Sequence, residues 1–322
     1  MKIKAISSVF PKKVVENSEI ERWCGLEKEI IEKKIGVKKR FFLEKNETGT
    51  DLSVNAVLNL CKENPEFDLN KVGLMVVVTQ NPDYQLPHNS ALLQKALDLS
   101  KEVPCFDVSL GCSGFVYALS IVKGFMYIEE IDEALLITCD PYSRCMDKKD
   151  RNVIGLFGDA ATATWIKSDG QGEILRGDFG TDGSGFNNLI INTRPNEINK
   201  TEKQDNTFLK MNGRAIFNFM MNKVGDSISK CLKKNNLKEN EIDLFILHQA
   251  SRFLLEQFRK RENIPEKKMP IHLENYGNTV SSSIPIVLQK HLRKKDKLIR
   301  NILISGFGVG LSWATNIIKL ES

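Results

Sequence analysis

The stretch "FDVSLGCSGFVYALS", residues 106–120, joins the two patterns that decide the fold. It begins as an apolar, partly β-branched run that is typical of a buried strand, and it continues into Phe115, Leu119 and Val122 at helical spacing. Cys112 lies between them among small residues. Unpaired N–H groups at the start of a helix favour a thiolate. Cys112 is therefore either a nucleophile or a small core residue.

The same alternation of strand and helix continues along the chain. Short apolar runs predict strands, and longer amphipathic segments predict helices. This order predicts an α/β protein with buried, largely parallel sheets. The apolar runs occupy 73–79, 104–110, 133–139, 243–249 and 301–307, and the helical segments include 89–99 and 215–234.

A weak internal repeat indicates a duplication. "KVGLMVVVTQNPD" resembles "EIDLFILHQASR" with Gln80 aligned to Gln249, a shift of 169 residues (249 − 80). "LLITCD" from 135 resembles "ILISGF" from 302, a shift of 167 (302 − 135). Two pairs of strands with nearly the same shift predict an N-terminal half, 1–170, that holds Cys112, and a C-terminal half, 171–322. We expect an extended loop over 178–206, which has few periodic apolar residues.

Composition narrows the class of protein. The chain has 322 residues, of which 41% are hydrophobic and 27% charged, so a sizeable core can form. No apolar run approaches the ~20 residues of a membrane helix, and the N-terminal apolar segment is short for a signal peptide. We expect a cytoplasmic protein that binds no membrane. Seven cysteines without a CxxC pair, four histidines and a dispersed net charge of +5 argue against a disulfide framework, a metal site and nucleic-acid binding.

Three further elements carry candidate chemistry. His248 ends the apolar run "FILHQAS", Asn278 lies in the turn "ENYGNTVSSS", and the glycine-rich "SGFGVGLSW" spans 305–313. Functional residues of α/β sheets gather beyond the carboxyl ends of strands, so these elements are expected to converge on Cys112. The glycine-rich loop would present backbone N–H groups to a developing oxyanion. Taken singly, each element also fits a purely structural role.

Taken together, these elements resemble the thiolase superfamily, and within it the β-ketoacyl-ACP synthase III group. The resemblance rests on Cys112 in "SLGCSGFVYAL", His248 in "HQAS", Asn278 in "YGNT" and the loop "GFGVGLSW". "GLFGDAATATW" (155–165) and "IGVKKRFF" (35–42) also resemble segments of that family. The resemblance implies a duplicated, five-layered αβαβα fold and a homodimer.

The resemblance also implies a reaction. An acyl primer, carried by CoA or acyl carrier protein (ACP), would condense with malonyl-ACP with loss of carbon dioxide, in fatty acid or related secondary-metabolite biosynthesis. Cys112 would carry the acyl group, and the amides of Cys112 and Val309 would form the oxyanion hole. His248 and Asn278 would stabilise the charge that develops on decarboxylation. No cofactor is implied, because CoA and phosphopantetheine thioesters are the substrates.

Several positions depart from family members that use acetyl-CoA. Ile30 and Lys34 stand where a Trp and an Arg sandwich the CoA adenine, while Arg151 matches the second Arg of that sandwich. Ile cannot stack on adenine as an aromatic ring does, and Lys is a point charge. These differences favour a primer other than acetyl-CoA. Other substrate contacts implied by the resemblance are Ser251 on the pantetheine arm, Leu86 as the cap of the acyl pocket across the dimer, and Phe307 beneath the site.

A basic helix face follows the histidine motif. Its cations would receive the acidic carrier protein: Arg252, Arg259, Lys260 and Arg261. Two other functions stay open. An enzyme of this type could transfer the acyl group to an oxygen or nitrogen nucleophile, against which Asn278 argues. The chain could also be a non-catalytic partner subunit, against which Cys112 argues.

Overall fold

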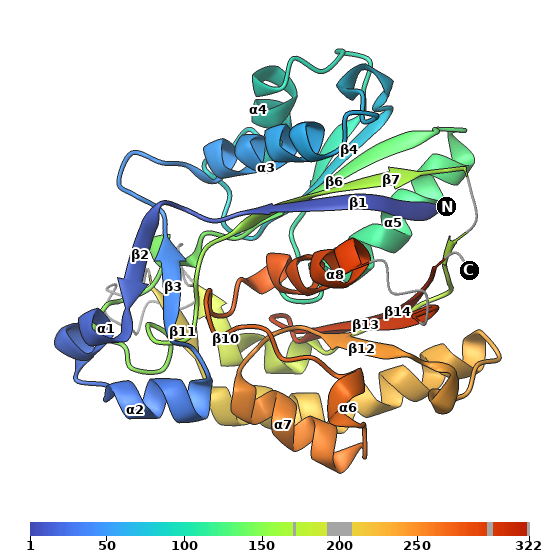
Figure 1. Ribbon diagram of the computed structural model, residues 1–322. Coiled ribbons are helices and arrows are strands. Elements are labelled where there is room, and N and C mark those ends of the chain that lie inside the picture. Colours follow the sequence, from blue (N-terminus) through green and yellow to red (C-terminus); the bar gives the residue numbers. More distant parts are fainter. Residues whose placement is uncertain (170–171, 192–207, 295–298, 321–322) are drawn as a thin grey trace.

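The computed structural model describes residues 1–169, 172–191, 208–294 and 299–320, and it forms five layers (Figure 1). Two helices cover the outer face of a first sheet, two lie between this sheet and a second one, and two cover the second sheet from outside. The predicted αβαβα arrangement is therefore confirmed. The helices, in the order of the layers, are α3 (Gly49–Glu63) and α4 (Asn89–Ala96), then α5 (Gly114–Ile128) and α8 (Ser283–Lys294), then α6 (Gly213–Lys234) and α7 (Arg252–Arg261).

The first sheet has the order β1-β7-β6-β4-β5, in which β4 runs parallel to β5 and β6 and the other pairs are antiparallel. Its strands β4 and β6 are buried along their whole length, because helices cover both faces. This explains their continuous apolar runs. The bounds are β1 (Lys2–Val9), β4 (Leu74–Val78), β5 (Cys105–Val108), β6 (Glu133–Cys139) and β7 (Ala161–Lys167).

In the second sheet β12 and β13 are parallel, while β14 pairs antiparallel with β13, β8 and β9. The prediction of largely parallel sheets was therefore wrong. The turn from β13 to β14 is too short for the crossover that a parallel pair needs, so β14 folds back as a hairpin. The bounds are β8 (Glu173–Ile174), β9 (Asp178–Thr181), β12 (Leu244–Leu247), β13 (Asn301–Gly308) and β14 (Ser312–Lys319).

The strands of the internal repeat occupy equivalent places. In the first sheet Val78 of β4 lies opposite Thr138 of β6, and in the second Leu247 of β12 lies opposite Ser305 of β13, both in parallel pairs. The limits of the two halves at 170 and 171 fall outside the described residues and stay a prediction. The loop expected over 178–206 was partly wrong, since it holds β9, a 3-10 turn at 183–188 and β10 (Leu189–Ile191); residues 192–206 lie outside the described part.

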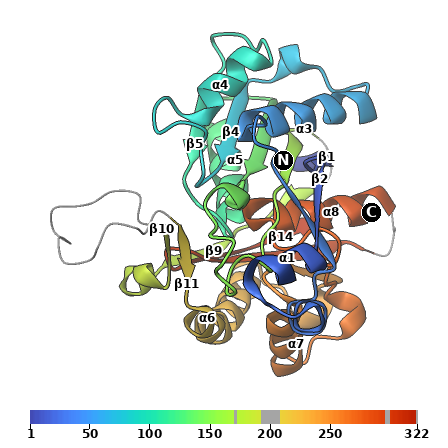
Figure 2. The same ribbon diagram turned by 90° about the vertical axis from the view of Figure 1, so that its left-hand side faces the viewer.

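A small group of elements lies at one end of the layers, beside α7 (Figures 1 and 2). Its two strands pair antiparallel, and Lys38 and Lys39 donate backbone hydrogen bonds to the carbonyl of Glu274 at 2.7 and 3.4 Å. These bonds join the group to the chain segment that precedes Asn278. The elements are β2 (Lys13–Glu16), α1 (Asn17–Cys24), α2 (Lys28–Ile30) and β3 (Lys39–Phe42); β11 (Leu209–Met211) pairs with β10.

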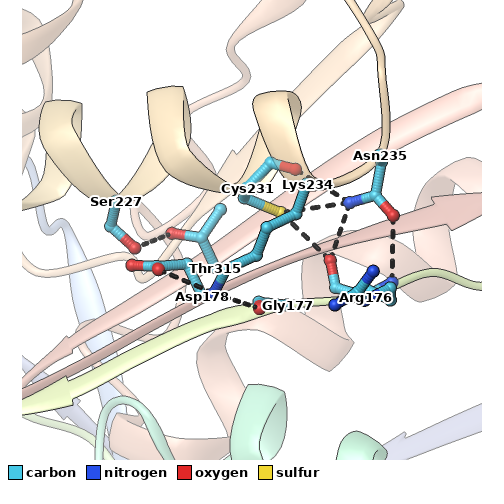
Figure 3. Close-up of polar contacts among 8 residues, drawn as sticks. All are labelled: Arg176, Gly177, Asp178, Ser227, Cys231, Lys234, Asn235 and Thr315. Carbon is cyan, nitrogen blue, oxygen red and sulfur yellow. Dashed lines mark hydrogen bonds and ion pairs between the residues drawn. The ribbon is translucent and has the colours of Figure 1, made fainter.

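Polar contacts join the C-terminal half of helix α6 to the second sheet and the segment before β9 (Figure 3). Lys234 Nζ lies 2.9 Å from a carboxylate oxygen of Asp178, and the hydroxyls of Ser227 and Thr315 are 2.8 Å apart. The thiol of Cys231 faces the carbonyl of Arg176 at 3.5 Å. Cys231 is thus a buried structural thiol.

Candidate active site

Cys112 lies between β5 and α5 and is only 5% exposed. The loop at the end of β13 closes over it from the other half of the chain. A Cβ atom on Gly306 would stand 2.5 Å from the Cys112 carbonyl oxygen, and one on Gly308 would stand 2.8 Å from its Sγ. Only glycine permits so close an approach of the two backbones. The glycine-rich sequence therefore serves to bring β13 against the cysteine.

The surroundings of Cys112 favour the protonated thiol. Burial raises its pKa to about 12, and the charge of Asp140 adds to this, while the N–H groups of Val309 and of Cys112 itself lower the pKa. These N–H groups therefore act in the expected direction, toward the thiolate. Helix α5 begins two residues later, at Gly114, and the loss of hydration outweighs the effect of the nearby N–H groups. The same two N–H groups are the ones predicted to form an oxyanion hole.

His248 follows β12 directly and is buried. Its backbone N–H donates to the carbonyl of Ser305 at 2.8 Å, and its ring meets that of Phe307 edge-on, with centroids 5.5 Å apart. Burial lowers the pKa of the imidazole to about 3, so the ring is neutral. A neutral imidazole can donate one hydrogen bond from the nitrogen that carries its proton.

Ser283 contacts one nitrogen of the ring. Its hydroxyl oxygen lies 2.7 Å from Nδ1 of His248 and also accepts from the backbone N–H of Gln249 at 3.4 Å. A hydroxyl has one proton and two lone pairs, so it can donate to Nδ1 or accept from it, according to the tautomer of the ring. When the hydroxyl donates to Nδ1, the ring proton resides on Nε2. The sequence did not reveal Ser283, since nothing distinguishes it from its neighbours in "VSSSIP".

Asn278 presents its amide NH2 beside Nε2 of His248. The backbone N–H of Val280 donates to Oδ1 of Asn278 at 2.9 Å, which fixes the orientation of the amide. Nδ2 then lies 3.4 Å from Nε2 of His248 and 3.5 Å from the carbonyl of Ala250. In the tautomer with Nε2–H, the ring and the amide are two N–H donors side by side, and they suit one acceptor oxygen of a substrate better than they suit each other.

Val280 links the asparagine turn to the cysteine turn. Its φ of 52° lies in the left-handed region, which a β-branched residue rarely adopts, and the residue is fully buried. Its Cγ1 lies 3.2 Å from the position of a Cβ on Gly111. The backbone N–H groups of Val280 and Ser281 are both held, the latter by Asp140 at 3.4 Å. Such strain persists where the surroundings fix the backbone, as is common at functional sites.

The residues predicted to contact CoA are all partly or fully accessible to solvent. Ile30 is half-buried, and Lys34 and Arg151 are exposed; Arg151 donates to the carbonyl of Gly25 at 3.1 Å. Ser251 is the N-cap of α7 and accepts from the N–H of Leu254 at 3.3 Å. The hydroxyl of Ser251 therefore already has a structural use.

The basic face of α7 is largely paired within the protein. Arg252 lies 3.7 Å from Glu274, Arg261 lies 3.5 Å from Glu262, and Arg259 lies 3.4 Å from Glu266 and is 15% exposed. Lys260 is exposed and forms no ion pair with any residue that the structure describes. Of the four predicted docking cations, Lys260 is therefore the most accessible to a carboxylate of a partner.

Leu86 stands on the surface, 85% exposed, in the segment between β4 and α4. A hollow adjoins it on the side of β5, and β5 is the edge strand of the first sheet, with all four residues half-exposed. Phe307, by contrast, is fully buried beneath His248. The hollow is lined by Thr79, Pro82, Tyr84, Gln85, Leu86, Pro87, His88, Asp107 and Ser109.

Solved structures with this architecture define the class of protein. A crystal structure of a 3-oxoacyl-(acyl-carrier-protein) synthase III matches with a TM-score of 0.91 and 33% identity, over 99% of each chain. The β-ketoacyl-ACP synthase III of Thermus thermophilus matches with a TM-score of 0.91 and 27% identity, over 100% of this chain and 99% of that one. The fold is that of a thiolase-like acyltransferase.

Sequence comparison gives the family. The family model "3-Oxoacyl-[acyl-carrier-protein (ACP)] synthase III" matches residues 106–183, and the corresponding C-terminal model matches 232–320. The β-ketoacyl-[acyl-carrier-protein] synthase III of Streptococcus agalactiae is 32% identical over 99% of both chains, and that of Coxiella burnetii is 29% identical over 99% of both. The chain belongs to the β-ketoacyl-ACP synthase III family, and it catalyses the condensation of an acyl primer in fatty acid biosynthesis.

No helix in the described part of the chain has the length and apolar character needed to cross a membrane.

Proposed function

We propose that Cys112 carries the acyl group and that His248 and Asn278 carry out the decarboxylation. In the first step Sγ of Cys112 attacks the carbonyl carbon of the primer thioester. The bond from that carbon to the departing sulfur breaks, and the thiol proton of Cys112 passes to the departing thiolate. The N–H groups of Val309 and Cys112 would bind the oxyanion of this step. Their effect on the pKa of the thiol supports this, because it requires them to face the sulfur.

In the second step malonyl-ACP loses carbon dioxide. The electron pair of the broken carbon–carbon bond moves toward the thioester oxygen, which Nε2 of His248 and Nδ2 of Asn278 would hold. The resulting carbanion attacks the acyl carbon on Cys112 and expels its sulfur, which takes a proton from solvent. The pair of donors 3.4 Å apart is the observation that carries this assignment. A donor pair has no evident use in acyl transfer to oxygen or nitrogen, which needs no enolate.

The primer is the feature in which this enzyme would differ from relatives that use acetyl-CoA. Ile30 and Lys34 offer neither a ring nor a planar guanidinium to an adenine, so an acyl-ACP donor is favoured over an acyl-CoA donor. The exposed ammonium of Lys260 would contact the acidic carrier protein. A solved relative, the priming β-ketosynthase of the R1128 polyketide pathway (26% identity, TM-score 0.88), illustrates specialised priming within this fold.

Acyl loading tests this proposal directly. The purified protein is incubated with acyl-CoAs and acyl-ACPs of several chain lengths, and the acyl adduct is read by intact mass. Loading from acyl-ACP in preference to acetyl-CoA is expected, with no adduct in Cys112→Ala. Equal or better loading from acetyl-CoA would refute the specialised primer. Full condensation activity in Cys112→Ala would refute the nucleophile.

A homodimer would complete the acyl site. Among the strands that the structure describes, the edge strand β5 pairs only with β4, and a second copy paired along its other side would cover the exposed Leu86 and the adjoining hollow. Light scattering of the purified protein tests this assembly. A dimer that dissociates in Leu86→Asp is expected, and a monomeric parent protein would contradict it.

A further inference from the structure

Arg40 of β3 is a charged residue with no solvent exposure. Its Nη2 donates to the carbonyl of Gly155 at 2.9 Å, while Nε and Nη1 have no hydrogen-bond partner among the described residues. Burial lowers its pKa to about 10, although the charges of Glu16 and Glu19 oppose this. A buried guanidinium with two nitrogens that donate no hydrogen bond costs folding free energy. Its presence therefore needs a reason other than stability.

The carbonyl that accepts from Arg40 belongs to the segment 155–158, which is hydrogen-bonded to the backbone of Asn278. The N–H of Asn278 donates to the carbonyl of Leu156 at 2.9 Å, and its own carbonyl accepts from the N–H of Gly158 at 3.0 Å. The two segments form an isolated parallel β-bridge between Phe157 and Asn278. Both backbone polar groups of Asn278 are thus bound by this one segment.

The segment is also fixed closely against β3. A Cβ on Gly158 would stand 3.0 Å from Cβ of Arg40 and would collide with the carbonyl of Tyr276. The three backbone segments that contain Gly158, Arg40 and Tyr276 therefore meet without room for a side chain on Gly158. Just beyond the segment, the N–H of Asp159 donates to the carbonyl of Phe41 at 2.8 Å. Arg40 therefore anchors one end of a short strap whose middle holds Asn278.

We propose that Arg40 is a positioning residue for decarboxylation: its guanidinium fixes the strap 155–158 and so aims the Asn278 amide beside Nε2 of His248. This rests on the proposed role of Asn278. A misplacement of about 1 Å can cost about 100-fold in rate. We expect the effect to be selective, because acyl loading depends on Cys112 and the loop at the end of β13, and among the described residues no backbone hydrogen bond joins the strap to either of them.

Two substitutions and two half-reactions test the proposal. Arg40→Met keeps the length and removes the charge, and an apolar replacement of a buried ion is often neutral or stabilising. Arg40→Lys keeps the charge but loses the planar fork, and it serves if the methionine variant fails to fold. Carbon dioxide release from carboxyl-labelled malonyl-ACP is expected to fall about tenfold or more in Arg40→Met and less in Arg40→Lys. Loading of Cys112 by intact mass should change by less than about twofold.

Arg144→Met is the control for loss of an arginine–carbonyl bond elsewhere: Arg144 is exposed and donates to the backbone carbonyl of Glu44 at 2.8 Å, not to the strap. Equal losses in both half-reactions, or no loss of carbon dioxide release, would overturn the role of Arg40. Asn278→Ala separates the two proposals. If it abolishes release while Arg40→Met keeps it, the positioning role alone fails; if it too keeps release, the assignment of Asn278 fails and the role of Arg40 with it.

Discussion

The hydroxyl of Ser283 lies 2.7 Å from Nδ1 of His248, whose other ring nitrogen, Nε2, faces Asn278. We expect this hydroxyl to donate to Nδ1 during decarboxylation and so to keep the ring proton on Nε2, since the tautomer with Nδ1–H cannot donate from Nε2 to the substrate oxygen. Ser283→Ala should lower carbon dioxide release from malonyl-ACP about tenfold, the usual effect of a positioned hydrogen bond worth ~1.4 kcal/mol. Acyl loading of Cys112 should change little.

Ser282→Ala provides the control for that experiment. Ser282 is equally buried and its hydroxyl is bonded, to the carbonyls of Thr138 and Ala160 at 3.1 and 3.2 Å, but it does not touch His248. A similar loss of carbon dioxide release in both variants would mean that the Ser283 hydroxyl acts only through local packing.

Asp140 should make Cys112 less reactive at neutral pH. Burial raises the pKa of Asp140 to about 6, so the group is charged at neutral pH, and its charge helps to raise the pKa of the Cys112 thiol. Removal of the charge in Asp140→Asn lowers that pKa and increases the thiolate fraction at every pH above about 7. Below about pH 6 both proteins lack the charge, so their alkylation rates should converge. The rate of iodoacetamide alkylation of Cys112, followed by peptide mass against pH, measures this, with an expected gain of about threefold or more.

Asp159→Asn is the control variant. Asp159 is also buried with a pKa raised to about 6, but its charge raises the pKa of Cys139 and Cys145. An unchanged pH profile at Cys112 in Asp140→Asn would show that burial alone sets the pKa of the thiol.

The sequence was enough to place Cys112, His248 and Asn278, because each follows or opens an element whose apolar pattern is clear. It could not reveal Ser283 or Arg40, since the function of each depends on which backbone atom folding brings to it. The size of the burial effect on the pKa of Cys112 could not be predicted for a related reason. The start of a helix can be read from a pattern, whereas the complete burial of a thiol under the loop of β13 cannot. The antiparallel pairing of β1, β7 and β14 could not be predicted, because an apolar run carries no direction.

Lys260 should contribute to the recognition of the carrier protein more than its neighbours on α7 do. Its charge is exposed and unpaired among the described residues, whereas Arg259 is held by Glu266. Lys260→Glu should raise KM for malonyl-ACP about threefold or more at low salt, and less at high salt because of screening. KM for malonyl-CoA should stay unchanged. Lys267→Glu, the same charge change at another exposed position, is the control, and an equal effect there would indicate a response to net charge only.

Ile30→Trp should restore use of CoA thioesters if the loss of adenine stacking is what disfavours them. Ile30 is half-buried at the end of α2. Arg151, the residue that matches the second Arg of the adenine sandwich, donates to the carbonyl of Gly25. A Trp ring stacked on the adenine is worth ~1 kcal/mol or more, which corresponds to a decrease of about fivefold in KM for acyl-CoA. Acyl-ACP carries no adenine, so its KM should not change, and Ile30→Ala should leave both substrates as they are. If Ile30→Trp improves acyl-ACP and acyl-CoA alike, the side chain acts on the protein rather than on the nucleotide, and the preference for a carrier-bound primer has another origin.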